Sequence, residues 1–148
     1  MEKISPDVTT RVVVPLLLRD FQNTNPGIRL GALTALCQMA DPKAVPLAVL
    51  QEALDDPYER VRQEALWKLS RMPDQRALAV PALIRALDDP EPLVRNNAVI
   101  FLWNIGPEAR AAAPKLITLT NDPDSGLRQN VIRALQEIDP GRWATNRP

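Results

Sequence analysis

The sequence contains no histidine and a single cysteine, Cys37. Histidine is the commonest metal ligand and the usual general base near neutral pH, so its absence removes most metal and acid–base chemistry. One cysteine cannot form a disulfide within the chain, and no Ser/His/Asp set, glycine-rich phosphate loop or zinc-type spacing is present. We therefore expect no catalysis by this chain alone, no metal and no cofactor, and a reducing cytoplasm as its compartment.

Long apolar runs and an excess of charge of either sign are also missing. The longest apolar stretch covers residues 12–18 and is interrupted by Pro15, which makes it too short to span a bilayer. Lysine plus arginine and aspartate plus glutamate number 18 each, so no net field attracts nucleic acid or an anionic membrane. At 148 residues the chain is expected to form one folded body without membrane insertion.

An internal repeat of 33 residues dominates what the sequence does contain. Each copy has an arginine that is preceded by an apolar residue, such as Ile28, and followed by apolar residues at offsets of three, four, seven and ten, such as Ile132. The position before the arginine and the offsets of three, seven and ten trace one stripe of an α-helix, so an amphipathic helix is predicted to begin near each arginine. The four arginines are Arg29, Arg62, Arg95 and Arg128.

An apolar segment upstream of each of these helices predicts a first helix, which completes a helical hairpin. The segments cover residues 14–18, 45–54, 80–87 and 113–119. Proline and a preceding amide or acidic residue mark the corner between the two helices, because proline cannot continue a helix and its neighbour caps free backbone donors. These corners are Asn25-Pro26, Asp56-Pro57, Asp89-Pro90 and Asp122-Pro123.

Prolines also mark the ends and the interiors of these hairpins. A second corner closes each repeat at Asp41-Pro42, Met72-Pro73, Gly106-Pro107 and Asp139-Pro140. Within the first helices, an interior proline costs about 3 kcal/mol, so its recurrence predicts helices that kink or restart there. These prolines are Pro15, Pro46, Pro81 and Pro114.

The repeat resembles the bacterial HEAT repeat, especially the HEAT-like subtype named after phycobilisome lyases. The resemblance rests, in the last repeat, on Gly106-Pro107, Pro114, Asp122-Pro123, Leu127-Arg128 and Ala134-Leu135. It implies an all-α class with an armadillo-like helical architecture, namely an α-α superhelix (HEAT-repeat solenoid) of four helical hairpins. We expect a single domain, 1–148, with repeats over roughly 6–40, 41–72, 73–106 and 107–140 and a tail over 141–148.

The resemblance also implies that the corner aspartates and the repeated arginines pair within and between neighbouring repeats. Such a structural ladder suits strict repetition better than the alternative, an anion-binding stripe, because a binding partner is rarely periodic. Arginine forks would also satisfy the corner carbonyl groups. The predicted ladder consists of Arg29, Arg62, Arg95 and Arg128 with Asp56, Asp89 and Asp122.

The resemblance implies that the second helices line a concave face. On this face, the side chains one, five, eight and nine residues after each repeated arginine are expected to point away from the core. Trp67, Ile100 and Trp103 fall at these offsets and form a predicted apolar patch, unless the indoles fill gaps between repeats. Cys37 also falls at an outward offset, where it is a weak candidate nucleophile. The predicted rim of the patch consists of Gln63, Asn96, Asn97, Asn104, Arg71, Gln129 and Arg133.

The two end repeats differ from each other. The last one has the polar outer side chains of a cap, including Lys115, Thr118 and Thr120. The first helix is apolar around most of its circumference, so it either docks on a partner, self-associates, or is wrapped so that both sides are covered. The residues that carry this prediction are Val12, Val13, Leu16 and Leu17.

Three functions are compatible with this sequence. The preferred one is a non-catalytic scaffold or adaptor that binds a protein or peptide on the concave face. The alternative, which only the resemblance supports, is a chromophore-lyase-like or chaperone-like subunit that acts with a partner protein. DNA-backbone binding is disfavoured, because the net charge is zero and Glu64 and Glu137 dilute Lys68, Arg71 and Arg133.

Overall fold

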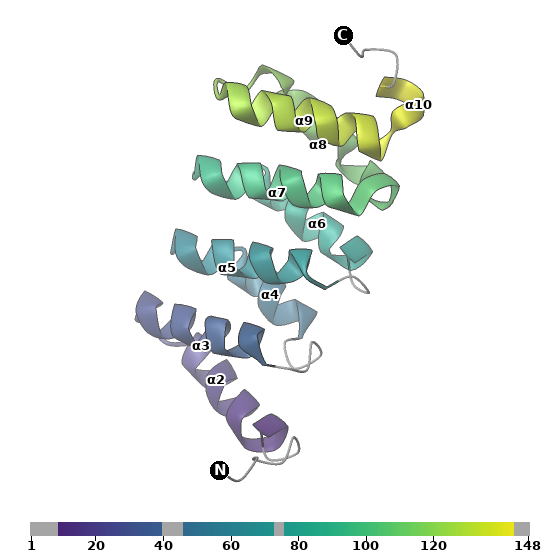
Figure 1. Cartoon of the computed structure of the whole chain (residues 1–148). Helices are drawn as coiled ribbons and strands as arrows, with labels where there is room; N and C mark the ends of the chain where they lie inside the picture. The colour runs from purple at the N-terminus through teal and green to yellow at the C-terminus, as the bar shows by residue number, and fades with distance from the viewer. Residues whose placement is uncertain (1–8, 40–45, 73–75, 144–148) are drawn as a thin grey trace. The chain divides into compact units, whose positions relative to one another are not determined.

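The computed structural model describes residues 9–39, 46–72 and 76–143, and all regular elements in these ranges are helices (Figure 1). The predicted all-α class is therefore confirmed. The chain divides into two compact units, Met1–Lys68 and Leu69–Pro148. The single domain stays a prediction. None of the described helices is both long and apolar enough to cross a membrane.

The first unit contains two helical hairpins, in which α2 packs against α3. Its core is formed by fully or nearly fully buried side chains, including Phe21, Leu33, Leu36, Leu50 and Leu66. The last two residues of α5 belong to the second unit. In chain order the elements are the π-helical turn η1 (Thr9–Val13), α2 (Val14–Phe21), α3 (Pro26–Gln38), α4 (Leu47–Ala53) and α5 (Glu59–Ser70).

The second unit contains two further hairpins and a short final helix. Helix α7 packs against both α6 and α9, and Leu83, Leu102, Leu116 and Leu135 are buried in its core. The elements are α6 (Arg76–Ala86), α7 (Pro92–Ile105), the 3-10 helix η4 (Gly106–Ala112), α8 (Ala113–Thr118), the 3-10 turn η5 (Leu119–Asn121), α9 (Ser125–Ile138) and α10 (Pro140–Trp143).

The repeated prolines act as restart points in three of the four first helices. Pro15 and Pro114 lie in the first turns of α2 and α8, and Pro46 is the N-cap residue of α4. At these positions the missing N–H is no loss, because the first turn has no intrahelical acceptor for it. Pro81 is the exception, since α6 continues through it.

One of the second corners depends on a glycine. Gly106 has a φ of 72°, which L side chains rarely adopt, and its N–H donates to the carbonyl oxygens of Leu102 and Trp103 at the end of α7. At Asp139-Pro140 the aspartate caps α9 and the proline begins α10. The predicted corner Asp41-Pro42 and the proline of Met72-Pro73 lie outside the described residues.

Two apolar residues of the repeated pattern lie outside the core, namely Ile28, a member of the predicted stripe, and Ile132, at the offset of four. Ile28 is 42% exposed and Ile132 is 46% exposed. Leu33 and Val99, at the same offset as Ile132, are each followed by another hairpin of their own unit and are fully buried. Among the described residues no further hairpin follows α9 or precedes α2, which explains why the repeated pattern alone misplaces these two side chains.

Candidate functional site

Each of the four repeated arginines is clamped by two backbone carbonyl groups at the corner before its own helix. In every case Nη1 donates to the carbonyl oxygens five and six residues upstream, which binds one edge of the guanidinium group to the corner. The distances are 2.9 and 3.0 Å from Arg29 to Asn23 and Thr24, 2.8 and 3.2 Å from Arg62 to Asp56 and Pro57, 2.9 and 3.2 Å from Arg95 to Asp89 and Pro90, and 2.7 and 3.0 Å from Arg128 to Asp122 and Pro123.

The residue six positions before each arginine also shapes the corner with its side chain. Asp56 accepts a hydrogen bond from the N–H of Tyr58 at 2.8 Å, and Asp89 and Asp122 make the equivalent bond two residues ahead. These side chains close a local turn and leave their second oxygen available for other donors.

Asn23 is the corresponding residue of the first hairpin, since its side chain accepts from the N–H of Asn25 at 2.9 Å. Asn25-Pro26, which was predicted to mark this corner, does lie between α2 and α3, two residues after the position equivalent to the corner aspartates. Asn25 is the N-cap residue of α3 and accepts from the N–H of Gly27 at 2.8 Å. The spacing of six residues before Arg29 identifies Asn23 as the equivalent of the corner aspartates.

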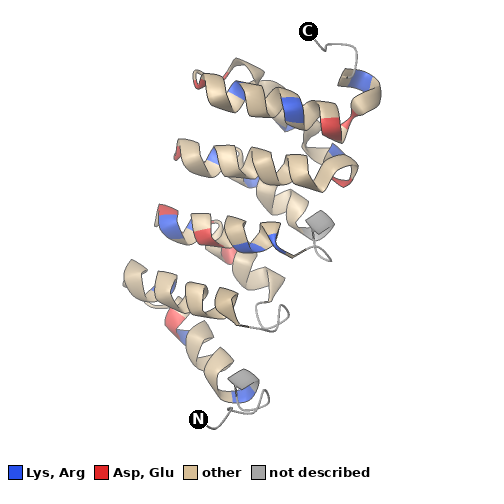
Figure 2. Ribbon diagram, in the orientation of Figure 1, with Lys and Arg blue, Asp and Glu red and all other residues tan. Residues whose placement is uncertain are grey.

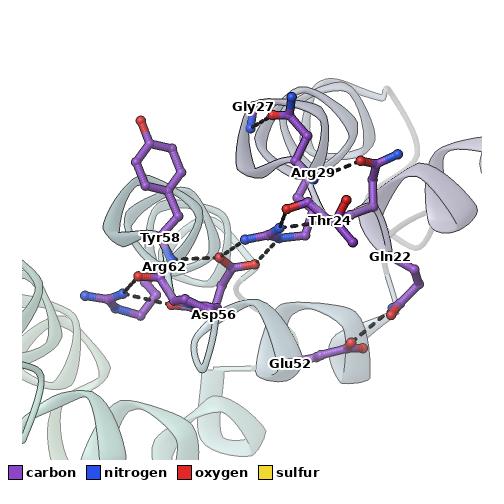
Figure 3. Close-up of polar contacts among 11 residues, drawn as sticks. Gln22, Thr24, Gly27, Arg29, Glu52, Asp56, Tyr58 and Arg62 are labelled. Atoms are coloured by element: carbon purple, nitrogen blue, oxygen red, sulfur yellow. Dashed lines mark hydrogen bonds and ion pairs between the residues drawn. The ribbon is translucent and has the colours of Figure 1, made fainter.

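In the first unit the free edge of Arg29 binds the corner aspartate of the next hairpin (Figure 3). Its Nε and Nη2 donate to the two carboxylate oxygens of Asp56 at 2.7 and 2.8 Å. Burial alone would raise the pKa of Asp56, but hydrogen bonds from Arg29 and the Tyr58 N–H, with the charges of Arg29 and Arg62, outweigh it and lower the pKa. The side chain of Asp56 is only 6% exposed, and Arg29 provides the ion pair that this buried carboxylate makes.

In the second unit, the equivalent contact between an arginine and the next corner aspartate is longer at Arg95 and is not made by Arg128 within the described residues. Nη2 of Arg95 lies 3.8 Å from Oδ2 of Asp122, and its buried Nε has no hydrogen-bond partner. Arg128 keeps its two carbonyl contacts, but no carboxylate of the described residues approaches it. Of these three arginines, Arg29 makes the tighter contact with the next corner and Arg95 a weaker one, and Arg128 makes none with the residues that the structure describes.

The predicted apolar patch is divided between the two units, so the structure describes its two parts separately. Trp67 belongs to the first unit and is 45% exposed, with Gln63 half-buried on the same helix. Ile100 and Trp103 belong to the second unit and are both half-buried, and Arg71 is exposed. The patch as a whole stays a prediction.

Helices α7 and α9 of the second unit are joined by a hydrogen bond at one predicted rim residue, Asn96. Nδ2 of Asn130 donates to Oδ1 of Asn96 at 2.8 Å, which joins the two helices. Ile100 and Trp103 follow Asn96 along one face of α7, at helical spacings of four and seven residues. Asn97 is half-buried beside them.

Three rim residues have polar groups that the fold leaves unused. Asn104 on α7 and Gln129 and Arg133 on α9 are exposed, and within the described part of the chain their side chains form no hydrogen bond or ion pair. We define the amide face by the residues Asn96, Ile100, Trp103, Asn104, Gln129 and Arg133.

Cys37 does not point outward as predicted. It is buried, and burial raises the pKa of its thiol to about 12, an effect that Glu64 increases and Lys68 opposes. Nζ of Lys68 donates to the Cys37 carbonyl oxygen at 2.7 Å, so α5 covers this side of α3. The thiol is therefore unsuited to act as a nucleophile, and Lys68 is not part of a basic surface.

The first helical segment does expose apolar side chains. Val12, Val13 and Leu16 are exposed and Leu17 is half-buried, while Phe21 is buried against the rest of the unit. The alternative that wrapping covers both sides of the segment is wrong for the three exposed residues.

Charge is distributed without a dominant sign over both units (Figure 2). An open groove of about 360 Å³ in the first unit is lined by Phe21, Glu52, Asp55 and the Arg29–Asp56 pair. Several polar groups of the groove already pair with one another, because Arg29 binds Asp56 and Gln22 donates to Glu52 at 3.0 Å. Among the residues described, no group of three or more metal-ligating side chains is present.

Comparisons with known proteins agree with this architecture. The family model of HEAT repeats matches residues 11–80 and 80–144. No curated protein matches the chain. An engineered protein is similar in structure, with a TM-score of 0.61, 22% sequence identity, and coverage of 90% of this chain and 67% of its own.

Two other solved structures are also similar. The complex of CpcE and CpcF of phycocyanin lyase from Nostoc sp. PCC7120 has a TM-score of 0.65 at 22% identity over 96% of this chain and 59% of that one. A second engineered protein has a TM-score of 0.60 at 23% identity over 84% of this chain and 37% of that one. The chain thus spans less than two thirds of the length of these two proteins. At such identities the likeness shows the fold alone, whereas the repeat model matches nearly the whole sequence: the chain belongs to the family of HEAT-repeat proteins.

Proposed function

We propose that this protein is a non-catalytic scaffold that binds a protein or an extended peptide on the amide face of α7 and α9. The observation that carries the proposal concerns the exposed side chains of Asn104, Gln129 and Arg133, which form no hydrogen bond or ion pair within the described chain. They lie on the packed helices α7 and α9, and α7 also carries the half-buried Ile100 and Trp103. An apolar centre with adaptable polar side chains around it is the composition of a protein-binding surface.

The chemistry of the amide face suits main-chain recognition. Asn104 and Gln129 each offer a donor and an acceptor, which match the N–H and C=O groups of an extended peptide. Covering roughly 100 Å² of apolar surface on Ile100 and Trp103 would contribute about 2.5 kcal/mol before association costs. Arg133 adds a preference for a carboxylate on the bound segment.

The proposal is confined to the second unit, whose helices α7 and α9 pack against each other. The predicted contributions of Trp67, Gln63 and Arg71 stay predictions, as does a location in the cytoplasm. The chromophore-lyase-like or chaperone-like alternative also stays a prediction, and the buried Cys37 gives it no chemical support. Lys68 gives no support to DNA-backbone binding, because it is buried and its amine donates to the Cys37 carbonyl oxygen.

Selection of peptides from a random display library against the full-length protein tests this function. We expect peptides that bind wild type and lose affinity by at least about tenfold for the triple variant Asn104→Ala/Gln129→Ala/Arg133→Ala. Because these three exposed side chains make no hydrogen bond or ion pair within the described chain, the variant should fold normally, which circular dichroism can verify.

A matched control is Glu108→Ala/Arg142→Ala, which removes two other exposed charges of the second unit and should bind as wild type does. Equal affinity of the triple variant and wild type, or the absence of any selected binder, would contradict the proposal.

A further inference from the structure

Two exposed side chains of opposite charge lie one turn apart on α9, at the border of the amide face. Arg133 belongs to the amide face, and Glu137 follows it on the same side of the helix because it lies four residues later. Neither side chain forms a hydrogen bond or an ion pair with the described residues. An arginine that precedes a glutamate by four residues is in the less favourable order for a helical ion pair, which is consistent with two separate charges.

The asparagine pair, Asn96 of α7 and Asn130 of α9, keeps a donor and an acceptor for a ligand. Nδ2 of Asn130 donates to Oδ1 of Asn96 at 2.8 Å, and neither side chain has another hydrogen bond within the described chain. Nδ2 of Asn96 and Oδ1 of Asn130 therefore match the C=O and N–H groups of a peptide main chain. Both residues are half-buried on helices that pack against each other, so a main chain bound to them lies along the seam between α7 and α9.

The asparagine pair also fixes the register of α7 against α9. The two helices run side by side in the same direction in the second unit (Figure 1). Counted from the pair, Arg133 lies level with Ile100, and Glu137 lies level with Asn104. The two charged side chains thus border one side of the seam, and the apolar and amide side chains of α7 border the other.

We propose that the amide face selects an extended segment in which an acidic residue and a basic residue flank an apolar one. This inference rests on the proposed function, because it names the chemistry of the segment that the same surface would bind. Four residues of helix advance about 6 Å and two residues of extended chain about 6.6 Å, so the acidic residue reaches Arg133 while the basic one reaches Glu137. The residue between them points to the opposite side of the strand, toward Ile100 and Trp103 of α7.

A segment with charges of a single sign fits this surface less well. A second carboxylate would lie beside Glu137, or a second cation beside Arg133, and contacts between like charges oppose binding. Glu137 opposes a nucleic-acid backbone for the same reason. Because both charged residues are exposed, each ion pair adds little affinity, and the charges act mainly by excluding other segments.

Five capped heptapeptides test this charge pattern with the full-length protein. Each has leucine at the centre and two threonines at either end, and the flanking positions carry aspartate and lysine in either order, two aspartates, two lysines, or the neutral pair asparagine and glutamine. The indole N–H signal of Trp103 in nitrogen-15 NMR spectra reports binding. We expect the better mixed peptide to bind wild type at least about fivefold more tightly than either peptide with one charge sign. This preference should shrink at high salt.

Charge reversal on the protein should redirect the preference, whichever way the segment lies. Arg133→Glu leaves two glutamates on α9 and should favour the peptide with two lysines. Glu137→Arg leaves two arginines and should favour the peptide with two aspartates. Glu108→Arg is the matched control, because it reverses an exposed charge of η4 and should keep the preference of wild type. Thermal unfolding by circular dichroism verifies that the variants are folded.

Three results would overturn the inference. They are equal affinity of wild type for mixed and single-sign peptides, a preference that neither Arg133→Glu nor Glu137→Arg redirects, and the failure of every designed peptide to bind. Binding of the neutral peptide as tightly as the mixed ones would also contradict charge selection, but it would leave the scaffold proposal standing. That proposal is decided separately, by the library selection and the triple alanine variant.

Discussion

Arg29 on α3 and Arg128 on α9 occupy the same position of the repeat, and both donate Nη1 to the two carbonyl groups of their own corner. They differ in what the next hairpin supplies. Arg29 binds the carboxylate of Asp56, whereas Arg128 has no carboxylate beside it among the described residues. The repeat thus fixes where the guanidinium group lies, and the neighbouring hairpin decides whether it stabilises the fold or faces solvent.

The residues one turn later show the same contrast. Leu33 is fully buried and Ile132 is nearly half-exposed, although the sequence pattern treats them alike. Leu33→Ala should lower the free energy of unfolding by about 3 kcal/mol, because it removes buried methyl groups and leaves a cavity. Ile132→Ala should change it by less than about 0.5 kcal/mol. Urea unfolding of the two variants measures this difference, and similar losses would mean that α9 is covered.

Arg29→Ala is expected to have the next largest effect. It leaves the carboxylate of Asp56 buried without its partner, which should cost about 2 to 3 kcal/mol of unfolding free energy. Urea unfolding again provides the measurement. Arg29→Ala/Asp56→Asn should recover part of the loss, because no unpaired charge remains. A double variant no more stable than the single one would show that the ion pair is not the cause.

Acid should weaken the Arg29–Asp56 interaction in a defined direction. The folded-state pKa of Asp56 lies below its ordinary value of 3.8, so the unfolded chain takes up this proton first as the pH falls. The stability from this group is therefore present above that value and is lost as the pH falls through the folded-state pKa. The difference in unfolding free energy between wild type and Asp56→Asn should shrink on acidification, and a constant difference would contradict the assignment.

Arg95→Ala should have a smaller effect than Arg29→Ala. The gap of 3.8 Å to Asp122 and the unpaired Nε indicate a weak ion pair, so most of the loss comes from the two corner carbonyl contacts. We expect about 1 kcal/mol and a melting temperature lower by roughly 3 °C. A loss equal to that of Arg29→Ala would show that both ion pairs are equally strong in solution.

The 33-residue spacing was sufficient to predict the helical hairpins, because each stripe of apolar residues and each proline reports on local structure. It was not sufficient for Ile28, Ile132 and Cys37, because their exposure depends on which neighbouring helix covers them. A pattern that is the same in every repeat carries no information about neighbours. Asn23 was not singled out, because the proline of the first corner follows Asn25, two residues later than in the other repeats.

The binding residues were predictable only in part. The offsets identified Asn104, Gln129 and Arg133 as outward residues, and the structure describes them as exposed and unused by the fold. The Asn96–Asn130 hydrogen bond could not be predicted, because it depends on the register between α7 and α9. The lack of a carboxylate beside Arg128 among the described residues could not be predicted either, because Arg128 has the same sequence environment as the arginines that are paired.

The unfolding free energies of Arg29→Ala and Arg128→Ala, measured together in urea, test most directly whether neighbouring hairpins give equivalent arginines different roles. Both variants lose two carbonyl contacts, but only Arg29→Ala strands a buried carboxylate, so we expect it to be less stable by at least about 1.5 kcal/mol. Equal losses in the two variants would contradict the account.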